Sequence, residues 1–307
     1  MTSIENTNVP IYEIRFPAIT ICNNNQVYLP NTKNLTAKLK PHLHQKNSTN
    51  NPIYYVSGAG HKYSLVIVIN VEPNMYVSGL APFYGSEILI HDGFAYPEVS
   101  INPIIAAVNT SVTAQIGAHT IKTDKNVQSI PINKRGCSFD GEVKLDYESE
   151  YSYETCVTEC RMDRIIELCH CIPYFYRYSG ETRFCIYTDV PCLNRYKVLF
   201  YSTYNPKKGM HSRVIDEADD IGIDLEKCGC YPSCEDITYE VQTQTFNVIQ
   251  NTSFFMPIQV GNKTPEISNK TFLFVNYQHL TLIQYRRDVR VTWNNLLGNS
   301  VKKIIIV

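Results

Sequence analysis

The sequence predicts an α+β fold in which an antiparallel β-sheet accompanies a helical region held together by disulfide bonds. Two observations support this prediction. Segments between residues 64 and 122 are rich in β-branched residues that partly alternate with polar ones, which is typical of antiparallel strands. Ten of the 11 cysteines lie between Cys137 and Cys234, where the helix signals also occur. The 307 residues suffice for one large domain or two modest ones.

The sequence predicts a polar connector near the start of the chain and several strands after it. Residues 30–52 are rich in Asn, Lys, Thr and Pro without a clear period, which indicates a connector or a small irregular region. Further along, apolar runs are separated by Pro, Gly and Asn. We expect strands at 64–71 (SLVIVINV), 86–90 (SEILI), 112–122 (VTAQIGAHTIK), 237–241 and 272–277.

Two helices are predicted within the cysteine-rich part. Ser152 precedes a helical pattern that runs to about Leu168, and a hydroxyl at this place accepts hydrogen bonds from the first free N–H groups of a helix. A second helix is expected at 216–227 (DEADDIGIDLEK). Both helices follow the predicted strands at 64–71, 86–90 and 112–122.

Charge and motif content exclude several classes of function. The chain has 28 basic and 29 acidic residues and a formal net charge of -1, so nothing indicates a nucleic-acid partner. It contains no metalloprotease helix, nucleophile elbow, phosphate loop or dinucleotide fingerprint. We therefore expect no enzyme, and no catalytic, cofactor-binding or metal-binding residues.

The cysteines and the glycosylation sequences indicate an oxidising compartment. Yet residues 1–10 do not resemble a signal peptide, and the apolar runs at 65–69 and 304–307 are shorter than the roughly 20 residues that cross a bilayer. The chain is thus either cytosolic or a fragment. Six Asn-x-Ser/Thr sequences are candidate glycosylation sites: Asn34, Asn47, Asn109, Asn251, Asn262 and Asn269.

The cysteine spacing is compatible with a nested set of bonds. Cys156 and Cys160 would share one face of a helix, and two cysteines two apart share one face of a strand at a similar spacing of about 6 Å. This is one of many combinations open to ten thiols, and a zinc site at His170 is an alternative that lacks the usual Cys-x2-Cys knuckles. The nested pairs are Cys137–Cys234, Cys156–Cys230, Cys160–Cys228, Cys169–Cys192 and Cys171–Cys185, with Cys22 unpaired.

Three motifs resemble the extracellular part of the degenerin/epithelial sodium channel family. They are residues 16–23 (FPAITICN), the cysteine block with its C-x3-C-x8-C-x-C and closing C-x-C-x3-C spacings, and residues 285–297 (YRRDVRVTWNNLL), in the family's order. Within the family, the chain looks most like an arthropod pickpocket-type subunit. The first motif matches at Phe16, Pro17, Ala18, Thr20, Cys22 and Asn23.

The resemblance implies an ectodomain like a clenched hand, from an amiloride-sensitive sodium channel that is gated by a ligand or another stimulus at the plasma membrane. Homo- or hetero-trimers carry sodium ions through membrane spans absent from this chain, and the nested disulfide pairs stiffen a thumb that moves the pore. The implied division is palm start (1–27), a short connector in place of the finger (28–60), palm and knuckle strands (61–136), thumb (137–234), returning palm strands (235–290) and wrist (291–307).

The resemblance also nominates residues for gating. Tyr285 and Trp293 would lie at the wrist. The acidic residues of the second predicted helix would lie on the thumb, although a solvated helix face explains them as well and the facing finger is missing. These acidic residues are Asp216, Glu217, Asp219 and Asp220.

Departures from the family pattern suggest an incomplete channel subunit. Cys22 lacks the finger cysteine with which the family pairs it, and no membrane span is present, so we expect that this chain alone does not conduct. A partial gene model or a truncated transcript would explain these departures. The alternative is a secreted or truncated disulfide-rich binding module, or a non-conducting decoy subunit in mixed trimers.

Overall fold

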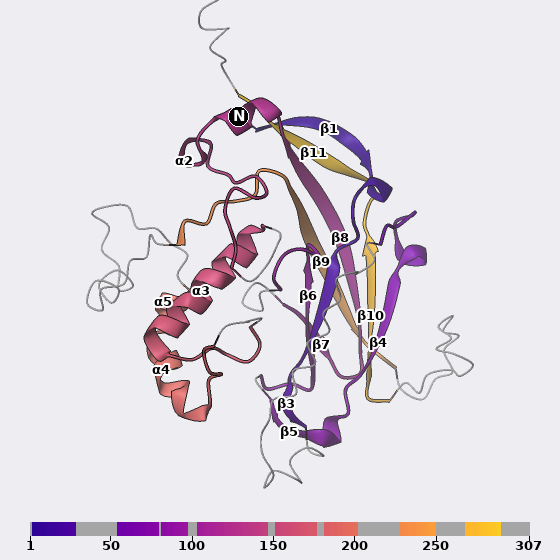
Figure 1. The fold of residues 1–307 in the computed structure, drawn as a ribbon. Helices are drawn as coiled ribbons and strands as arrows, with labels where there is room; N and C mark the ends of the chain where they lie inside the picture. Colours follow the sequence, from indigo (N-terminus) through magenta and orange to yellow (C-terminus); the bar gives the residue numbers. More distant parts are fainter. Residues whose placement is uncertain are drawn as a thin grey trace, which may run out of the picture. The chain divides into compact units, whose positions relative to one another are not determined.

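The chain folds into two compact units, which are described separately (Figure 1). Unit 1 comprises Met1–Gly93, Val99–Ile130 and Glu235–Val307, and unit 2 comprises Phe94–Glu98 and Pro131–Cys234. The chain therefore passes between the units four times. The computed structural model describes residues 2–28, 54–79, 81–97, 103–146, 151–176, 181–201, 228–249 and 268–289.

Unit 1 is built around a six-stranded sheet with the long strand β8 (Thr110–Thr123) in its interior. β9 (Asp236–Asn247) pairs antiparallel with β8 along one edge. Along the other edge, β10 (Lys270–Tyr277) and β11 (Thr281–Arg287) follow one another, and both run parallel to β8. A single long strand thus aligns two consecutive shorter ones.

The outer strands of this sheet are antiparallel to their neighbours. β4 (Leu65–Asn70) pairs with β10, and β1 (Thr2–Pro10) pairs with β11. Short 3-10 helices join the strands of unit 1: η1 (Ile11–Glu13), η2 (His61–Tyr63), η3 (Pro73–Met75) and η4 (Lys125–Ser129).

A second, three-stranded sheet shares its core with the first. β6 (Gly85–His91) lies between β2 (Ala18–Asn23) and β7 (Ile104–Ala107), and all its pairings are antiparallel. Alternate residues of β8 are buried because successive side chains of a strand point to opposite faces. The shared core includes Val112, Ala114 and Ile116 of β8, Leu273 and Val275 of β10, Ile88 of β6 and Ala106 of β7. A separate pair joins β3 (Asn25–Tyr28) to β5 (Tyr76–Gly79).

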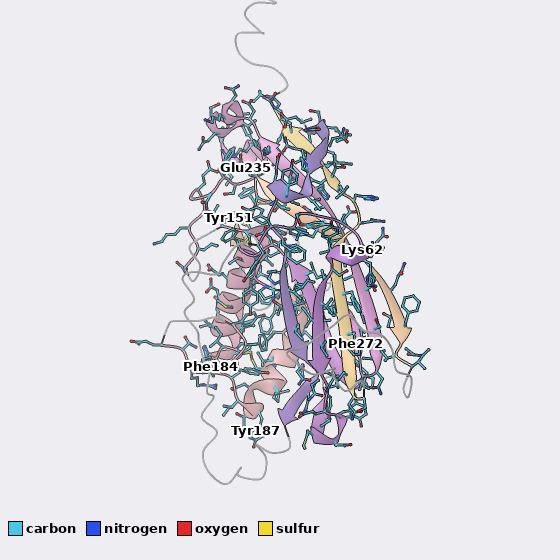
Figure 2. All side chains as sticks on the ribbon, turned by 90° about the vertical axis from the view of Figure 1, so that its right-hand side faces the viewer. Lys62, Tyr151, Phe184, Tyr187, Glu235 and Phe272 are labelled. Atoms are coloured by element: carbon cyan, nitrogen blue, oxygen red, sulfur yellow. A yellow bond between two sulfur atoms is a disulfide. The ribbon has the colours of Figure 1, made fainter. Side chains whose placement is uncertain are left out.

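Unit 2 is organised by the helix α3 (Tyr153–Cys169). Figure 1 shows α4 (Val190–Arg195) and α5 (Lys197–Tyr201) beside this helix. Figure 2 shows Tyr151 at the start of α3, and Phe184 and Tyr187 toward its other end. The core of unit 2 contains Met162, Ile165, Cys169, Cys171, Ile172, Tyr176 and Phe200. Among the described residues, unit 2 also has the short helices α2 (Ile132–Arg135) and η5 (Tyr187–Asp189).

The predicted α+β class is confirmed, and each expected strand is present. The large sheet is mixed rather than wholly antiparallel. β9 runs antiparallel to β8, whereas β10 and β11, which follow β9 in the sequence, run parallel to β8. The expected connector at 30–52 and helix at 216–227 lie outside the described residues. Among the described helices, none has the length and apolar character needed to cross a membrane.

Candidate functional site

Unit 2 contains a disulfide ladder, which we define as its five disulfide bonds. Two of them join α3 to the segment after residue 227. Cys156–Cys230 and Cys160–Cys228 have Cα–Cα distances of 5.8 and 5.5 Å, within the usual range of about 4.4 to 6.8 Å. Because the helical cysteines are four residues apart, they share a face of α3 and meet the two partners in reverse order. The helix is therefore tied to this segment at two consecutive turns.

A third bond closes the base of the ladder. Cys137 and Cys234 are fully buried, with a Cα–Cα distance of 4.9 Å. A bridge between Ser138 and Ser233 accompanies the bond, and the Ser138 carbonyl accepts a 2.7 Å hydrogen bond from the Cys234 N–H. The two ends of the long segment of unit 2, near Cys137 and Cys234, are thus joined by a disulfide and by a backbone hydrogen bond.

Tyr151 forms two hydrogen bonds with the backbone of Tyr231, which lies next to the bonded Cys230. Its hydroxyl donates to the Tyr231 carbonyl and accepts from the Tyr231 N–H at 3.0 Å. Burial raises the pKa of the Tyr151 hydroxyl, so the group stays protonated and keeps its donor role. Nothing in the spacing of the cysteines predicts this contact.

Two inner bonds fix the hairpin that follows α3. Cys169–Cys192 and Cys171–Cys185 have Cα–Cα distances of 5.9 and 4.8 Å. With the three bonds above, these are the five pairs that the family resemblance implies. Cys171, Cys185 and Asp189 also form a group of metal-ligand type, but its two sulfurs are bonded to one another.

An ion pair lies beside the inner bonds. Arg183 donates to both carboxylate oxygens of Asp189 at 2.7 and 2.8 Å, and the Ile186 N–H donates to the same carboxylate at 2.8 Å. The hydrogen bond from Arg183 is the main cause that lowers the pKa of Asp189 to about 2. The hairpin is thus held by polar contacts as well as by covalent bonds.

Two buried arginines lie on α3, and neither was predicted from its amino-acid pattern. Arg161 and Arg164 are 4% and 6% exposed and donate to the carbonyls of Phe200 and Leu199 near the end of α5. These carbonyls belong to the helix end that carries partial negative charge, which favours a cation there. The Arg161 guanidinium also lies 4.2 Å from the centre of the Tyr201 ring.

Arg164 extends the ladder by one further helical turn. Cys156, Cys160 and Arg164 follow one another at intervals of four residues on α3. The Nη2 atom of Arg164 lies 3.0 Å from the Sγ atom of Cys228 and donates to it. Burial, and then the charge of Arg161, lower the pKa of Arg164. The C-x3-C-x3-R spacing is the sequence signal that could have revealed this contact.

In unit 1, the FPAITICN motif enters the core of the sheets. The Phe16 ring packs edge-on against Tyr277 at 5.8 Å. The Arg15 carbonyl accepts hydrogen bonds from the hydroxyls of Tyr239 and Tyr277 at 2.9 and 3.1 Å. Burial raises the pKa of both tyrosines well above the usual range. Pro17 is buried, and Ala18 begins β2.

The polar residues of the motif contact neighbouring strands. Thr20 Oγ1 lies 2.9 Å from His91 Nε2, and Asn23 Oδ1 accepts from the Tyr76 hydroxyl at 3.0 Å. Cys22 is a half-buried free thiol opposite Glu87, and burial and then the Glu87 charge raise its pKa. The motif therefore holds β2 in place.

Of the wrist and thumb candidates, only Tyr285 lies among the described residues. Its ring meets His119 edge-on at 5.7 Å, and His119 Nδ1 lies 3.7 Å from a carboxylate oxygen of Glu240. Asn109 and Asn269 are the described glycosylation candidates, and the Asn269 N–H donates to Asn109 Oδ1 at 2.9 Å. The others lie outside the described part: Trp293, Asp216, Glu217, Asp219, Asp220, Asn34, Asn47, Asn251 and Asn262.

Comparisons with known proteins agree on one family of channels. A sequence model described as amiloride-sensitive sodium channel matches residues 44–300. The sodium channel protein Nach of Drosophila virilis is 27% identical over 80% of this chain and 56% of its own length. Pickpocket protein 11 of Drosophila melanogaster is 22% identical over 70% of this chain and 37% of its own length.

A vertebrate relative matches a shorter stretch. The epithelial sodium channel subunit gamma of Rattus norvegicus is 26% identical over 47% of this chain and 22% of its own length. The chain thus spans about half the length, or less, of the curated relatives it matches.

Proposed function

The chain belongs to the amiloride-sensitive sodium channel family, and we propose that it is the extracellular part of one subunit of such a channel. The family model covers residues 44–300, and the family consists of sodium channels rather than enzymes. The observation that carries the proposal is the disulfide ladder, whose spacings are those of the family motif. The chain matches 56% or less of these relatives, so we assign ion permeation to the complete protein.

We assign the two units to the parts of a channel ectodomain. The sheets of unit 1 are assigned to the palm and knuckle, which we place in residues 1–27, 61–136 and 235–290. Residues 94–98 and 131–136 of these ranges belong to unit 2. Residues 137–234 are the thumb, residues 28–60 the connector and residues 291–307 the wrist. The support for the thumb is that its expected limits coincide with the bonded pair Cys137 and Cys234.

The thumb would serve as a stiff lever between a stimulus and the gate. Two disulfides fix the helix α3 of the thumb at consecutive turns, and Cys137–Cys234 closes the base of the thumb. A displacement of one end of the thumb would therefore move the other end rather than deform the unit. Tyr285 and Trp293 are the wrist residues through which movement would reach the pore. The acidic residues between 216 and 220 are the proposed stimulus-facing groups of the thumb.

The complete protein would assemble into a homo- or hetero-trimer in the plasma membrane and conduct sodium ions. Expressing the complete product of the gene in oocytes, alone and with a candidate partner subunit, tests this. We expect an inward current that disappears when external sodium is replaced and that amiloride blocks. Surface-labelled protein without any such current would contradict the proposal.

The second candidate function is that of a secreted binding module or a decoy subunit. The extensive disulfide bonding, which stabilises a surface without a pore, is the observation that favours it. Expressing residues 1–307 together with a conducting relative distinguishes the two. A decoy lowers the relative's current and co-purifies with it, whereas a chain that leaves the current and the complex unchanged is no decoy.

A further inference from the structure

The five disulfides of unit 2 differ in how accessible their sulfurs are. Cys160–Cys228 has both of its cysteines in partly exposed positions. A thiol that attacks a disulfide must reach one of its sulfurs. Each of the other four bonds includes at least one buried cysteine, and three of them also include one partly exposed cysteine, at Cys185, Cys192 or Cys230. The buried cysteines of these four bonds are Cys137, Cys234, Cys156, Cys169 and Cys171. Exposure therefore favours Cys160–Cys228, where either sulfur can be approached, and a further feature must distinguish it from those three bonds.

A positively charged side chain contacts one sulfur of the same bond. Arg164 donates to Cys228 Sγ at 3.0 Å from a position one helical turn beyond Cys160. A neighbouring guanidinium stabilises a thiolate and lowers the pKa of its thiol. In thiol–disulfide exchange, the sulfur with the lower pKa is the better leaving group. Access favours this bond, and the contact with Arg164 distinguishes it from the other partly exposed bonds and identifies Cys228 Sγ as the leaving atom.

We propose that Cys160–Cys228 is a thiol-exchange site that reacts selectively with low-molecular-weight thiols such as glutathione. The incoming thiolate attacks Cys160 Sγ, where a new S–S bond forms as the bond to Cys228 breaks. The electron pair of the broken bond goes to Cys228 Sγ, beside Arg164. A second thiol then attacks the small-molecule sulfur of the mixed disulfide, which yields two cysteine thiols and one oxidised small thiol.

This inference does not depend on the proposed channel function, since it concerns chemistry of the folded chain. Opening this bond leaves Cys156–Cys230 and the base bond Cys137–Cys234 intact, so unit 2 stays closed while one tie of α3 is released. The site can thus change the stiffness of the ladder without unfolding it.

Partial reduction followed by mass spectrometry tests the selectivity. The folded 307-residue chain is treated with increasing concentrations of reduced glutathione, quenched with an alkylating reagent and digested. We expect alkyl or glutathionyl labels first at Cys160 and Cys228, while the other four bonds persist. Earlier opening of any other bond, or opening of all five together, would overturn the proposal. The free thiol of Cys22 is alkylated after denaturation in every sample and reports complete labelling.

Substitution of Arg164 tests its part in the reaction. We expect Arg164→Gln to slow exchange at this bond several-fold, because the pKa of the leaving thiol rises when the guanidinium is removed. Arg164→Lys keeps the charge and should lie between this variant and the parent. The matched control is Arg195→Gln, because Arg195 is an exposed arginine of α4 whose guanidinium lies 5.4 Å from the Tyr196 ring.

Equal exchange rates in the parent chain, Arg164→Gln and Arg164→Lys would refute the role of the guanidinium. Intact mass and thermal unfolding show whether each variant has formed its five bonds. If Arg164→Gln does not fold, the rate of Arg164→Lys and the order of reduction in the parent chain decide the matter. If a disulfide other than Cys160–Cys228 is the first to be reduced in the parent chain, the proposed site is refuted in that case too.

Discussion

Individual residues of unit 1 are constrained by close approach of the backbone. Gly85 begins β6 with a φ of +156°, and a Cβ at this position would lie 2.2 Å from the Ala106 carbonyl oxygen of β7. Glycine has no Cβ and tolerates both the conformation and the approach. Its position at the start of a predicted strand did not indicate this contact, which depends on a neighbour 21 residues later in the sequence.

Gly85→Ala should therefore destabilise the chain by about 1 to 3 kcal/mol, the usual range for overpacking in a well-packed site. Urea unfolding of the purified chain measures the effect. Gly93→Ala is the control, because no atom lies within 4 Å of its added Cβ. If both variants unfold at the same urea concentration, the described approach of β7 is incorrect.

The Arg183–Asp189 ion pair predicts a pH dependence of stability. The pKa of Asp189 is lowered from 3.8 to about 2, so the folded state favours the charged carboxylate. The pair contributes fully above about pH 4, and its contribution is lost as the pH falls toward 2. We expect Asp189→Asn to melt below the parent at pH 5 and to approach it by pH 2.

Thermal unfolding between pH 2 and 5 provides this measurement. Glu181→Gln, which changes an exposed carboxylate in the same hairpin, should follow the parent curve throughout. A constant difference between Asp189→Asn and the parent over the whole range would contradict the lowered pKa of Asp189.

At the level of elements, α3 shows how local signals determine a helix. Its first residue follows Ser152, whose hydroxyl accepts a 3.0 Å hydrogen bond from the Thr155 N–H. It ends at Cys169, and the next residue, His170, adopts a left-handed conformation with φ 52°. The cap predicted from the sequence is therefore present.

Ser152→Ala should cost about 1 kcal/mol, the typical loss when a helix cap is removed. Because α3 carries one side of three disulfides, we expect the variant to keep its five bonds and to lose stability rather than its fold. Circular dichroism during urea unfolding measures the difference. Ser152→Asp retains a capping oxygen and should restore most of it, and a parent-like Ser152→Ala would show that the cap is unimportant.

Elements with a strong local pattern could be predicted, and elements defined by distant partners could not. The β-branched runs gave β4, β6, β8, β9 and β10 because their composition alone favours strands. β1 was missed because its sequence TSIENTNVP is polar and becomes a strand only by pairing with β11, at the other end of the described chain. The parallel pairings of β8 depend in the same way on long connections.

The site was predictable to a similar degree. The spacing was compatible with the five bonds, and the family resemblance selected them among many combinations. The helix predicted at Cys156 and Cys160 is present. The extended segment assumed at Cys228 and Cys230 is wrong, because Gly229 adopts a positive φ of 55° and the first strand described after Cys228 begins only at Asp236.

The buried arginines were missed because their partners are carbonyls of α5 and a sulfur, which leave no charge pattern in the sequence. Tyr151 was missed for the same reason, because it contacts the backbone of Tyr231.

At the level of the whole molecule, the bonds enclose very different lengths of chain. Cys137–Cys234 spans a sequence separation of 97 residues, and Cys171–Cys185 spans 14. In the chain-entropy account, a bond that closes a longer loop restricts the unfolded chain more strongly. Because Cys156–Cys230 lies inside the base bond and already joins 74 of these residues, the base bond by itself closes an effective loop of 97 − 74 = 23 residues. It should therefore contribute only slightly more to the stability of the ladder than Cys171–Cys185 does.

Removing the base bond with Cys137→Ala and Cys234→Ala should cost about 3 to 4 kcal/mol, and removing the inner bond with the matched pair Cys171→Ala and Cys185→Ala should cost about 3 kcal/mol. Urea unfolding of both variants gives the comparison. A clearly larger loss for the inner pair would show that native packing, rather than loop closure, determines what each bond contributes.

At the scale of the channel, we propose that the disulfide ladder transmits movement to the pore of a sodium channel subunit. Single-channel recording of the complete protein, with and without the two bonds Cys156–Cys230 and Cys160–Cys228, is the decisive test. We predict that alanine at these four positions changes the open probability, while the sodium conductance and the block by amiloride stay the same. An unchanged open probability in a variant that reaches the surface without these bonds would contradict the claim.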